Sequence, residues 1–146
     1  MDRLLLLRRV PLFARLTLDQ LEAINVIISE AHYVDGEVIC SEGDLGDDLY
    51  VLAEGEVDIF RNFGTDRQIR LGGQSPVSCF GEIAVLSNTP RSATVVATRK
   101  ARLLRLQGTR LKELVMQMPE ISFDFFQVLT DRVRAADQRF EDATRG

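Results

Sequence analysis

The chain contains few of the residues on which metal sites, disulfide frameworks and membrane spans are built. Its 146 residues include one histidine and two cysteines, Cys40 and Cys79, which give neither a metal-ligand spacing nor a disulfide framework. We therefore expect two core thiols and a reducing, cytoplasmic location. The one apolar run near the start, residues 4–7, is too short for a signal-peptide core, and no stretch approaches the length of a membrane span.

Basic residues are also fewer than acidic ones. Eighteen Lys and Arg stand against 22 Asp and Glu, which gives a net charge of −4. Because binding to a nucleic-acid backbone draws on clustered cations, we expect no direct contact of this chain with nucleic acid. The length, with 45% hydrophobic and 27% charged residues, is typical of one globular domain.

Short apolar runs separated by Gly and Asp turn residues fill the middle of the chain. Such spacing favours antiparallel strands in a roll or sandwich. We therefore predict an α+β, mainly β fold: a jelly-roll-like antiparallel β-roll flanked by helices at both ends. The expected strands are 31–34, 38–40, 49–53, 57–63, 67–71, 93–98 and 102–106.

Helical patterns flank this region. Thr17 followed by Gln20 predicts a capping box opening a helix over 17–28, after a short helix over 2–9. Helices are also expected over 108–118 and 119–140. The last carries an apolar stripe that is typical of core packing or of a dimer interface: Ile121, Phe125, Val128, Leu129, Val133, Ala136 and Phe140.

The most informative stretch is Phe-Gly-Glu-Ile-Ala-Val-Leu at 80–86, followed by Pro-Arg-Ser-Ala-Thr-Val at 90–95. Gly81 lets the backbone approach a ligand, and the next three amides can open a helix whose N–H groups point at an anion. Arg91 offers a planar fork of donors to phosphate, and Glu82 accepts hydrogen bonds from a sugar hydroxyl. The pattern predicts a ribose-phosphate site, with a buried Glu82–Arg91 ion pair as the purely structural alternative.

This stretch resembles the phosphate-binding cassette of the cyclic nucleotide-binding domain family, F-G-E-[LIM]-[AG]-x-L and then P-R-[STA]-A-[TS]-V. The resemblance extends to the glycine-spaced strands of residues 36–57. It implies that Glu82 holds the ribose 2′-hydroxyl and that Arg91 holds the cyclic phosphate, with Ser92 completing the anion site. It also implies three segments, 1–30, 31–107 with the cassette at 80–94, and 108–140. The ligand-binding residues it implies are Gly81, Glu82, Ile83, Ala84, Arg91, Ser92 and Ala93.

The base contacts are less marked by motif. The connection 72–78 is a few residues longer than the family's usual approach to the cassette and lacks its Gly-Asp pair. We take Ile59 and Leu71 as candidate walls for the purine. In the family the last helix is a lid over the base, which makes Phe126, Leu129 or Arg132 candidates for its cap. Ser92, at a position where Thr favours guanine, indicates cAMP before cGMP.

The resulting prediction is a regulatory module without enzymatic activity or metal, which binds a cyclic nucleotide and transmits binding through its last helix. We expect it to be part of a larger protein, to lack membrane contact in this chain, and to dimerise through that helix or to join an effector domain. The alternatives are the sensor portion of a catabolite activator-type transcription regulator and a degenerate domain that binds proteins. Metal-dependent cupins and haem or iron–sulfur sensors need more ligands than His32 and two cysteines provide.

Overall fold

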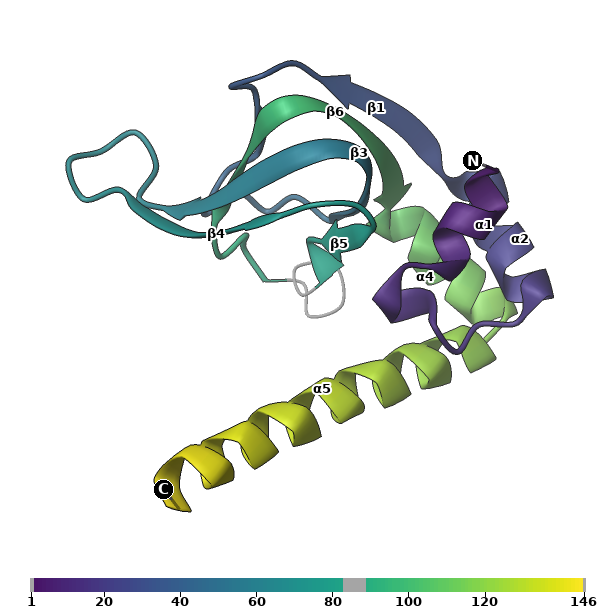
Figure 1. Cartoon of the computed structure of the whole chain (residues 1–146). Coiled ribbons are helices and arrows are strands. Elements are labelled where there is room, and N and C mark those ends of the chain that lie inside the picture. Colours follow the sequence, from purple (N-terminus) through teal and green to yellow (C-terminus); the bar gives the residue numbers. More distant parts are fainter. Residues whose placement is uncertain (1, 83–88, 146) are drawn as a thin grey trace.

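The computed structural model describes residues 2–82 and 89–145, which form an antiparallel sheet of six strands with helices before and after it (Figure 1). Strands pair in the order β1-β6-β3-β4, with β2 added to β6 and β5 to β3. This arrangement confirms the antiparallel roll with flanking helices. In chain order the elements are α1 (Arg3–Arg8), a 3₁₀ turn η1 (Pro11–Phe13), α2 (Leu18–Ile27), β1 (Ser29–Tyr33), β2 (Val38–Cys40), β3 (Asp48–Arg61), β4 (Ile69–Gln74), β5 (Ser78–Phe80), β6 (Thr94–Gln107), α4 (Gly108–Gln117) and α5 (Glu120–Arg145).

The two long strands differ from the prediction. The breaks expected in β3 at residues 54–56 and in β6 at 99–101 are absent, because each strand runs continuously for 14 residues. The β3–β6 register shifts three times between Leu52 and Val57, so the strands bend through bulges instead of ending. Gly55, with φ of 93°, lies within this region, and a Cβ there would overlap the carbonyl oxygen of Lys100.

Of the shorter strands, one lies at a different position from the one predicted and another was not predicted. The expected strand at 67–71 is β4, shifted toward the C-terminus to Ile69–Gln74. The three-residue strand β5 was not predicted, and it falls at the end of what was taken as a connection. The expected short helix at Glu82 lies, beyond Glu82 itself, outside the described residues.

Both faces of the central strands are buried. Leu49 and Val51 of β3 pack with Leu104 and Leu106 of β6 in a cluster under the helices. Alternate residues of the same strands, such as Leu52 and Leu103, belong to a second cluster inside the roll. Since successive side chains of a strand point to opposite faces, this two-sided burial accounts for the continuous apolar run at 49–53.

The capping box predicted at Thr17 is confirmed. The Thr17 hydroxyl accepts a hydrogen bond from the Gln20 amide at 3.2 Å, and the Gln20 side chain accepts one from the Thr17 amide at 2.9 Å. The helix that it opens buries Leu21 and Ile24 in the cluster under the helices. Local capping therefore fixes where the first long helix meets the sheet.

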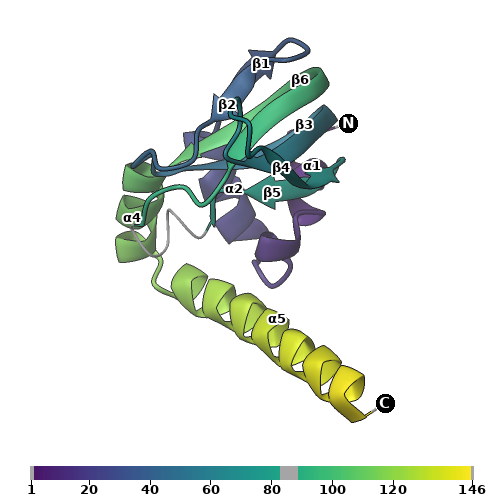
Figure 2. The same ribbon diagram turned by 90° about the vertical axis from the view of Figure 1, so that its left-hand side faces the viewer.

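The final helix α5 is held to the body through its first turns. Phe125 stacks on Phe13 of η1 with ring centroids 5.8 Å apart, and Asp131 forms an ion pair with Arg15 at 3.3 Å. From residue 131 to residue 144 every side chain is exposed, and the helix extends away from the roll in both views (Figures 1 and 2). None of the helices in the described residues is long and apolar enough to cross a membrane.

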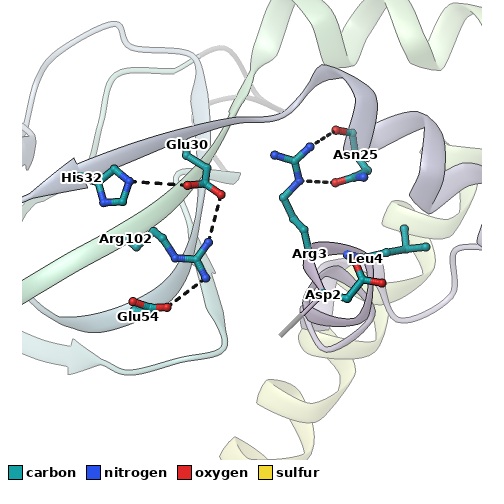
Figure 3. Close-up of polar contacts among 8 residues, drawn as sticks. All are labelled: Asp2, Arg3, Leu4, Asn25, Glu30, His32, Glu54 and Arg102. Carbon is teal, nitrogen blue, oxygen red and sulfur yellow. Dashed lines mark hydrogen bonds and ion pairs between the residues drawn. The ribbon is translucent and has the colours of Figure 1, made fainter.

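Polar contacts join the two N-terminal helices to each other, and a second group joins neighbouring strands (Figure 3). The Arg3 guanidinium donates to the backbone oxygen of Asn25 at 2.8 Å, which joins α1 to α2. Arg102 of β6 bridges Glu30 and Glu54 at 3.3 and 3.2 Å. His32 lies 3.6 Å from Glu30 with an exposed side chain, so the single histidine is a surface residue of β1.

We expect Thr17→Ala to lower the free energy of unfolding by about 1 kcal/mol, because it removes the acceptor for an otherwise unpaired helix N–H. Thr17→Ser is the matched control, since it keeps the hydroxyl and should retain most of the wild-type stability. Urea denaturation followed by circular dichroism measures both. Equal losses in the two variants would contradict a contribution from the cap.

Candidate functional site

A pocket of about 220 Å³ opens where the cassette meets the inner face of the roll. Strands β2 to β6 each contribute to its wall, and the turn at 89–93 closes one side. Because the contributing strands belong to the sheet, the wall is fixed by strand pairing. Its lining residues are Cys40, Ile59, Gln74, Cys79, Phe80, Gly81, Glu82, Thr89, Pro90, Arg91, Ser92, Ala93 and Val95.

The Arg91 guanidinium is the central charged group of this pocket. Only 6% of the residue is exposed. Its Nη2 donates to the backbone oxygen of Asp48 at 2.6 Å and its Nη1 to that of Gly81 at 3.3 Å. The Nε has no hydrogen-bond partner and is the only such buried side-chain atom among the described residues. A buried donor without a partner is costly, so Arg91 retains capacity for an acceptor.

Glycine is required beside this guanidinium. Gly81 has φ of 87°, and a Cβ at that position would overlap Arg91 Nη1 and lie 2.7 Å from the Asp48 oxygen. Residue 81 therefore combines a left-handed backbone with a close approach of the arginine. In the structure the group that approaches Gly81 is Arg91; the approach of a ligand expected from the sequence stays a prediction.

The backbone of Arg91 is clamped to the loop before β3. Its amide donates to the Asp44 oxygen and its own carbonyl accepts from the Gly43 amide, both at 2.8 Å. Next to this clamp, the Thr94 hydroxyl accepts from the Glu42 amide at 3.0 Å. Main-chain bonds on both sides thus fix the arginine before its side chain enters the pocket.

Glu82 pairs with the last helix. Its carboxylate lies 3.3 Å from Arg132 Nη1 of α5, and 15% of its side chain is exposed. Within residues 2–82 and 89–145 no ion pair joins Glu82 to Arg91, so the structural alternative considered for these two residues is not what is found. The acid of the pocket is instead linked to α5.

The remaining sequence-predicted residues divide between the pocket and other places. Ile59, Ser92 and Ala93 line the pocket, whereas Ile83 and Ala84 lie outside the described residues. Leu71 is not brought to the pocket: it is 51% exposed and falls at the register shift between β3 and β4. Of the three candidates on α5, Arg132 is the one that contacts a pocket residue.

Phe126 and Leu129 line a different cavity, which we call the α4–α5 cleft. This apolar cleft has a volume of about 480 Å³. These two side chains therefore line the cleft beside α4 and are not among the lining residues of the pocket around Arg91. The lining residues of the cleft are Leu111, Lys112, Val115, Met116, Ser122, Phe125, Phe126 and Leu129.

Sequence reasoning missed several residues of the pocket wall, notably Gln74 and the two cysteines. Gln74 lies in the segment where the sequence departs from the family pattern, so no motif marked it. Burial raises the pKa of Cys40, with the Arg91 charge acting in the opposite direction. Burial, followed by the Glu82 charge, raises the pKa of Cys79 to about 11, and Arg132 opposes this. Both thiols are protonated at neutral pH.

The pocket combines a positive charge, a carboxylate and an apolar wall. The buried guanidinium offers positive charge and a donor, while Glu82 offers carboxylate oxygens in the same pocket. Cys79, Phe80, Val95 and Ile59 supply an apolar wall. Such a pocket suits a ligand that carries a negative group, a hydroxyl and a flat apolar part.

Comparison with known proteins gives one consistent result. A family model described as Cyclic nucleotide-binding domain matches residues 30–118. A putative potassium channel protein of Rhodopseudomonas palustris is 38% identical over 127 residues, which cover 85% of this chain and 30% of that protein. The cyclic AMP receptor protein of Thermus thermophilus is 33% identical over 87% of this chain and 59% of its own length.

A solved structure gives the same picture. The N-terminal domain of a transcriptional regulator from Streptomyces coelicolor superposes with a TM-score of 0.81 and 31% identity, over 92% of this chain and 94% of that domain. The chain thus spans 30% to 59% of the length of the two curated relatives and nearly all of the separate domain.

The raised pKa of Cys79 predicts a loss of stability at alkaline pH. An unfolded thiol titrates at about 8.5, so above that pH the unfolded state releases its proton first and the free energy of unfolding falls until the pH reaches about 11. We expect Cys79→Ala to remove up to about 1.4 kcal/mol per pH unit of this slope. Urea unfolding between about pH 8 and 11 measures it.

The quantity compared is the slope of the free energy of unfolding against pH and not its absolute value, because loss of the Cys79 side chain also changes packing. Measurements near neutral pH record that packing cost separately in the same variant. A Cys79→Ala protein with the wild-type slope would contradict the assignment.

Proposed function

Because the chain belongs to the cyclic nucleotide-binding domain family, we propose that it is a regulatory sensor that binds a cyclic nucleotide, cAMP in preference to cGMP, in the pocket around Arg91. The cyclic phosphate binds the Arg91 guanidinium, and the ribose 2′-hydroxyl donates a hydrogen bond to the Glu82 carboxylate. Gly81, Ile83, Ala84, Ser92 and Ala93 complete the phosphate site. The domain performs no chemistry and needs no metal; we also propose a cytoplasmic location, from the cysteine usage given above.

The observation that carries this proposal is the buried Arg91 Nε without a partner. Two neutral carbonyl oxygens accept from the other guanidinium nitrogens, so the positive charge is hydrogen-bonded but not neutralised by them. An anionic ligand supplies both a counter-charge and an acceptor. Charge-assisted hydrogen bonds of this kind contribute about 1.5–3 kcal/mol each.

Transmission of binding follows from the second contact of Glu82. The carboxylate that receives the ribose hydroxyl is the group that Arg132 of α5 holds at 3.3 Å. A ligand that occupies Glu82 changes the energy of this bridge, and hence the equilibrium between positions of α5. A ligand shifts such an equilibrium only by its differential affinity for the two states.

The preference for cAMP and the effector are inferred from relatives and from residue chemistry. One relative is named a cyclic AMP receptor protein, and a matching solved structure is the N-terminal domain of a transcriptional regulator. The sensor portion of a transcription regulator is accordingly one form of this proposal. Another relative is a putative potassium channel protein, so a channel is a second form.

We further propose that α5 mediates dimerisation. Phe126, Val133 and Phe140 recur every seven residues and are 66%, 60% and 70% exposed, with Leu129 and Ala136 three residues after the first two. A seven-residue repeat of this kind is the pattern of a two-helix coiled coil. We call these five residues the α5 seam. The exposed members of this seam, Phe126, Val133 and Phe140, also fit the alternative, a degenerate domain of this fold that binds another protein.

We expect Arg91→Ala to weaken cAMP binding by about a hundredfold, because it removes the charge-assisted bonds to the phosphate. Glu82→Gln should cost less, since an amide oxygen still accepts from the ribose hydroxyl. Arg99→Ala is the matched control, because Arg99 is an exposed arginine of β6 away from the pocket. Isothermal titration calorimetry measures all four proteins.

Arg91 also holds backbone carbonyls, so each variant is first checked by thermal unfolding. If Arg91→Ala does not fold, Arg91→Lys keeps the charge and should still lose affinity with the planar fork. Wild-type affinity for cAMP in a folded Arg91 variant would overturn the site assignment.

A separate substitution tests the α5 seam. Val133→Asp places a charge in the centre of the repeat and should convert a dimer into a monomer, with cAMP affinity retained. Gln138→Asp, on the opposite side of the helix by heptad position, is the matched control and should leave the dimer intact. Sedimentation equilibrium of the wild type and both variants decides; a monomeric wild type would exclude dimerisation through α5.

A further inference from the structure

The strand wall of the pocket contains a polar side chain whose position is set by register. Gln74 of β4 pairs with Val57 of β3, and two residues along, Gly72 pairs with Ile59. Directly paired residues of antiparallel strands lie on the same face, as do residues two apart on one strand. Val57 is fully buried in the cluster inside the roll. Gln74 and Ile59 therefore project to the inner face, where both line the pocket.

Space is left beside these two residues. Gly72 carries no side chain, and a Cβ built there would meet no atom within 4 Å. Ile59 is only partly buried in its cluster. The paired strands β3 and β4 thus leave an opening at Gly72, between the aliphatic side chain of Ile59 and the amide of Gln74. An aliphatic surface suits the face of a flat heterocycle, and an amide suits its polar edge.

The Gln74 amide is oriented by a neighbour. Ser78, at the start of β5, donates through Oγ to Gln74 Oε1 at 3.2 Å. A carbonyl oxygen has two lone pairs, so Oε1 can still accept a second hydrogen bond, and the Nε2 group keeps its donors. Among the described strand residues of the pocket wall, the others carry apolar or thiol side chains. Gln74 is thus the group there that can both donate and accept.

We infer that Gln74 reads the base of the bound nucleotide and selects adenine over guanine, an inference that rests on the proposed function. Its Nε2 donates to N7 of adenine and its Oε1 accepts from the N6 amino group, the paired contact that glutamine makes with this base. Guanine presents two acceptors, O6 and N7, along the same edge, so Oε1 would face an oxygen. Ser78 is the positioning residue that keeps Oε1 in place.

Titration of cAMP and cGMP against wild type, Gln74→Leu and Gln74→Arg tests this. Gln74→Leu should weaken cAMP binding about five- to hundredfold and change cGMP binding less than about threefold, so that selectivity is lost. Gln74→Arg should shift preference toward cGMP, because a guanidinium donates to both O6 and N7 of guanine. Gln138→Leu, an exposed glutamine of α5, is the matched control and should keep the wild-type ratio.

The outcomes separate this inference from the proposed function. A wild-type protein that binds neither nucleotide would overturn both. If the wild type binds cAMP, and Arg91→Ala weakens it, but the Gln74 variants keep the wild-type cAMP-to-cGMP ratio, then only the role of Gln74 is wrong. Should Gln74→Leu fail to fold, Ser78→Ala tests the same point, since freeing the amide should lower selectivity with Gln74 still present; an unchanged ratio would again count against it.

Discussion

A buried cation held by neutral groups is the constraint around which the rest of the site is organised. The Arg91 side chain ties the carbonyls of Asp48 and Gly81, and its backbone ties the loop at 43–44. One residue thus fastens the start of β3, the end of β5 and the turn before β6 to one another. Removing a charge from water costs several kcal/mol unless a partner compensates. Among the described ion pairs none includes Arg91, so its charge has no acidic partner within the described residues.

The two halves of the domain differ in how firmly they are held. The central strands β3 and β6 are buried on both faces and carry the pocket wall. The last helix is packed through its first turns, and Arg132 connects it to Glu82 of the pocket. The strand wall is thus held on both faces and α5 through a few contacts, so displacing the helix costs less free energy than displacing the wall.

The sequence predicted what depends on local chemistry. The Thr17–Gln20 capping box, strand β2 and the helices after the roll all follow from short patterns. It failed where tertiary contacts decide: Gly55 signals a turn, yet the pairing of β3 with β6 carries both strands through a bulge. Strand β5 has only three residues and exists because β3 pairs with it.

The same division holds at the site. Arg91, Glu82 and Gly81 were marked by the cassette, and the structure brings them to one pocket. Gln74 was unmarked, because its place depends on the register of β4, and Leu71 was misjudged because the bulge lies beside it. The contact between Glu82 and Arg132 joins residues 50 positions apart in the sequence. No local pattern encodes such a contact.

Phe13 stacks on Phe125, and Arg15 forms an ion pair with Asp131. These two contacts attach η1 and the residues just after it to α5. A displacement of α5 must therefore move η1 with it or break both contacts. The N-terminal segment and α5 are therefore mechanically coupled, and neither can move relative to the roll without moving the other or losing these two contacts.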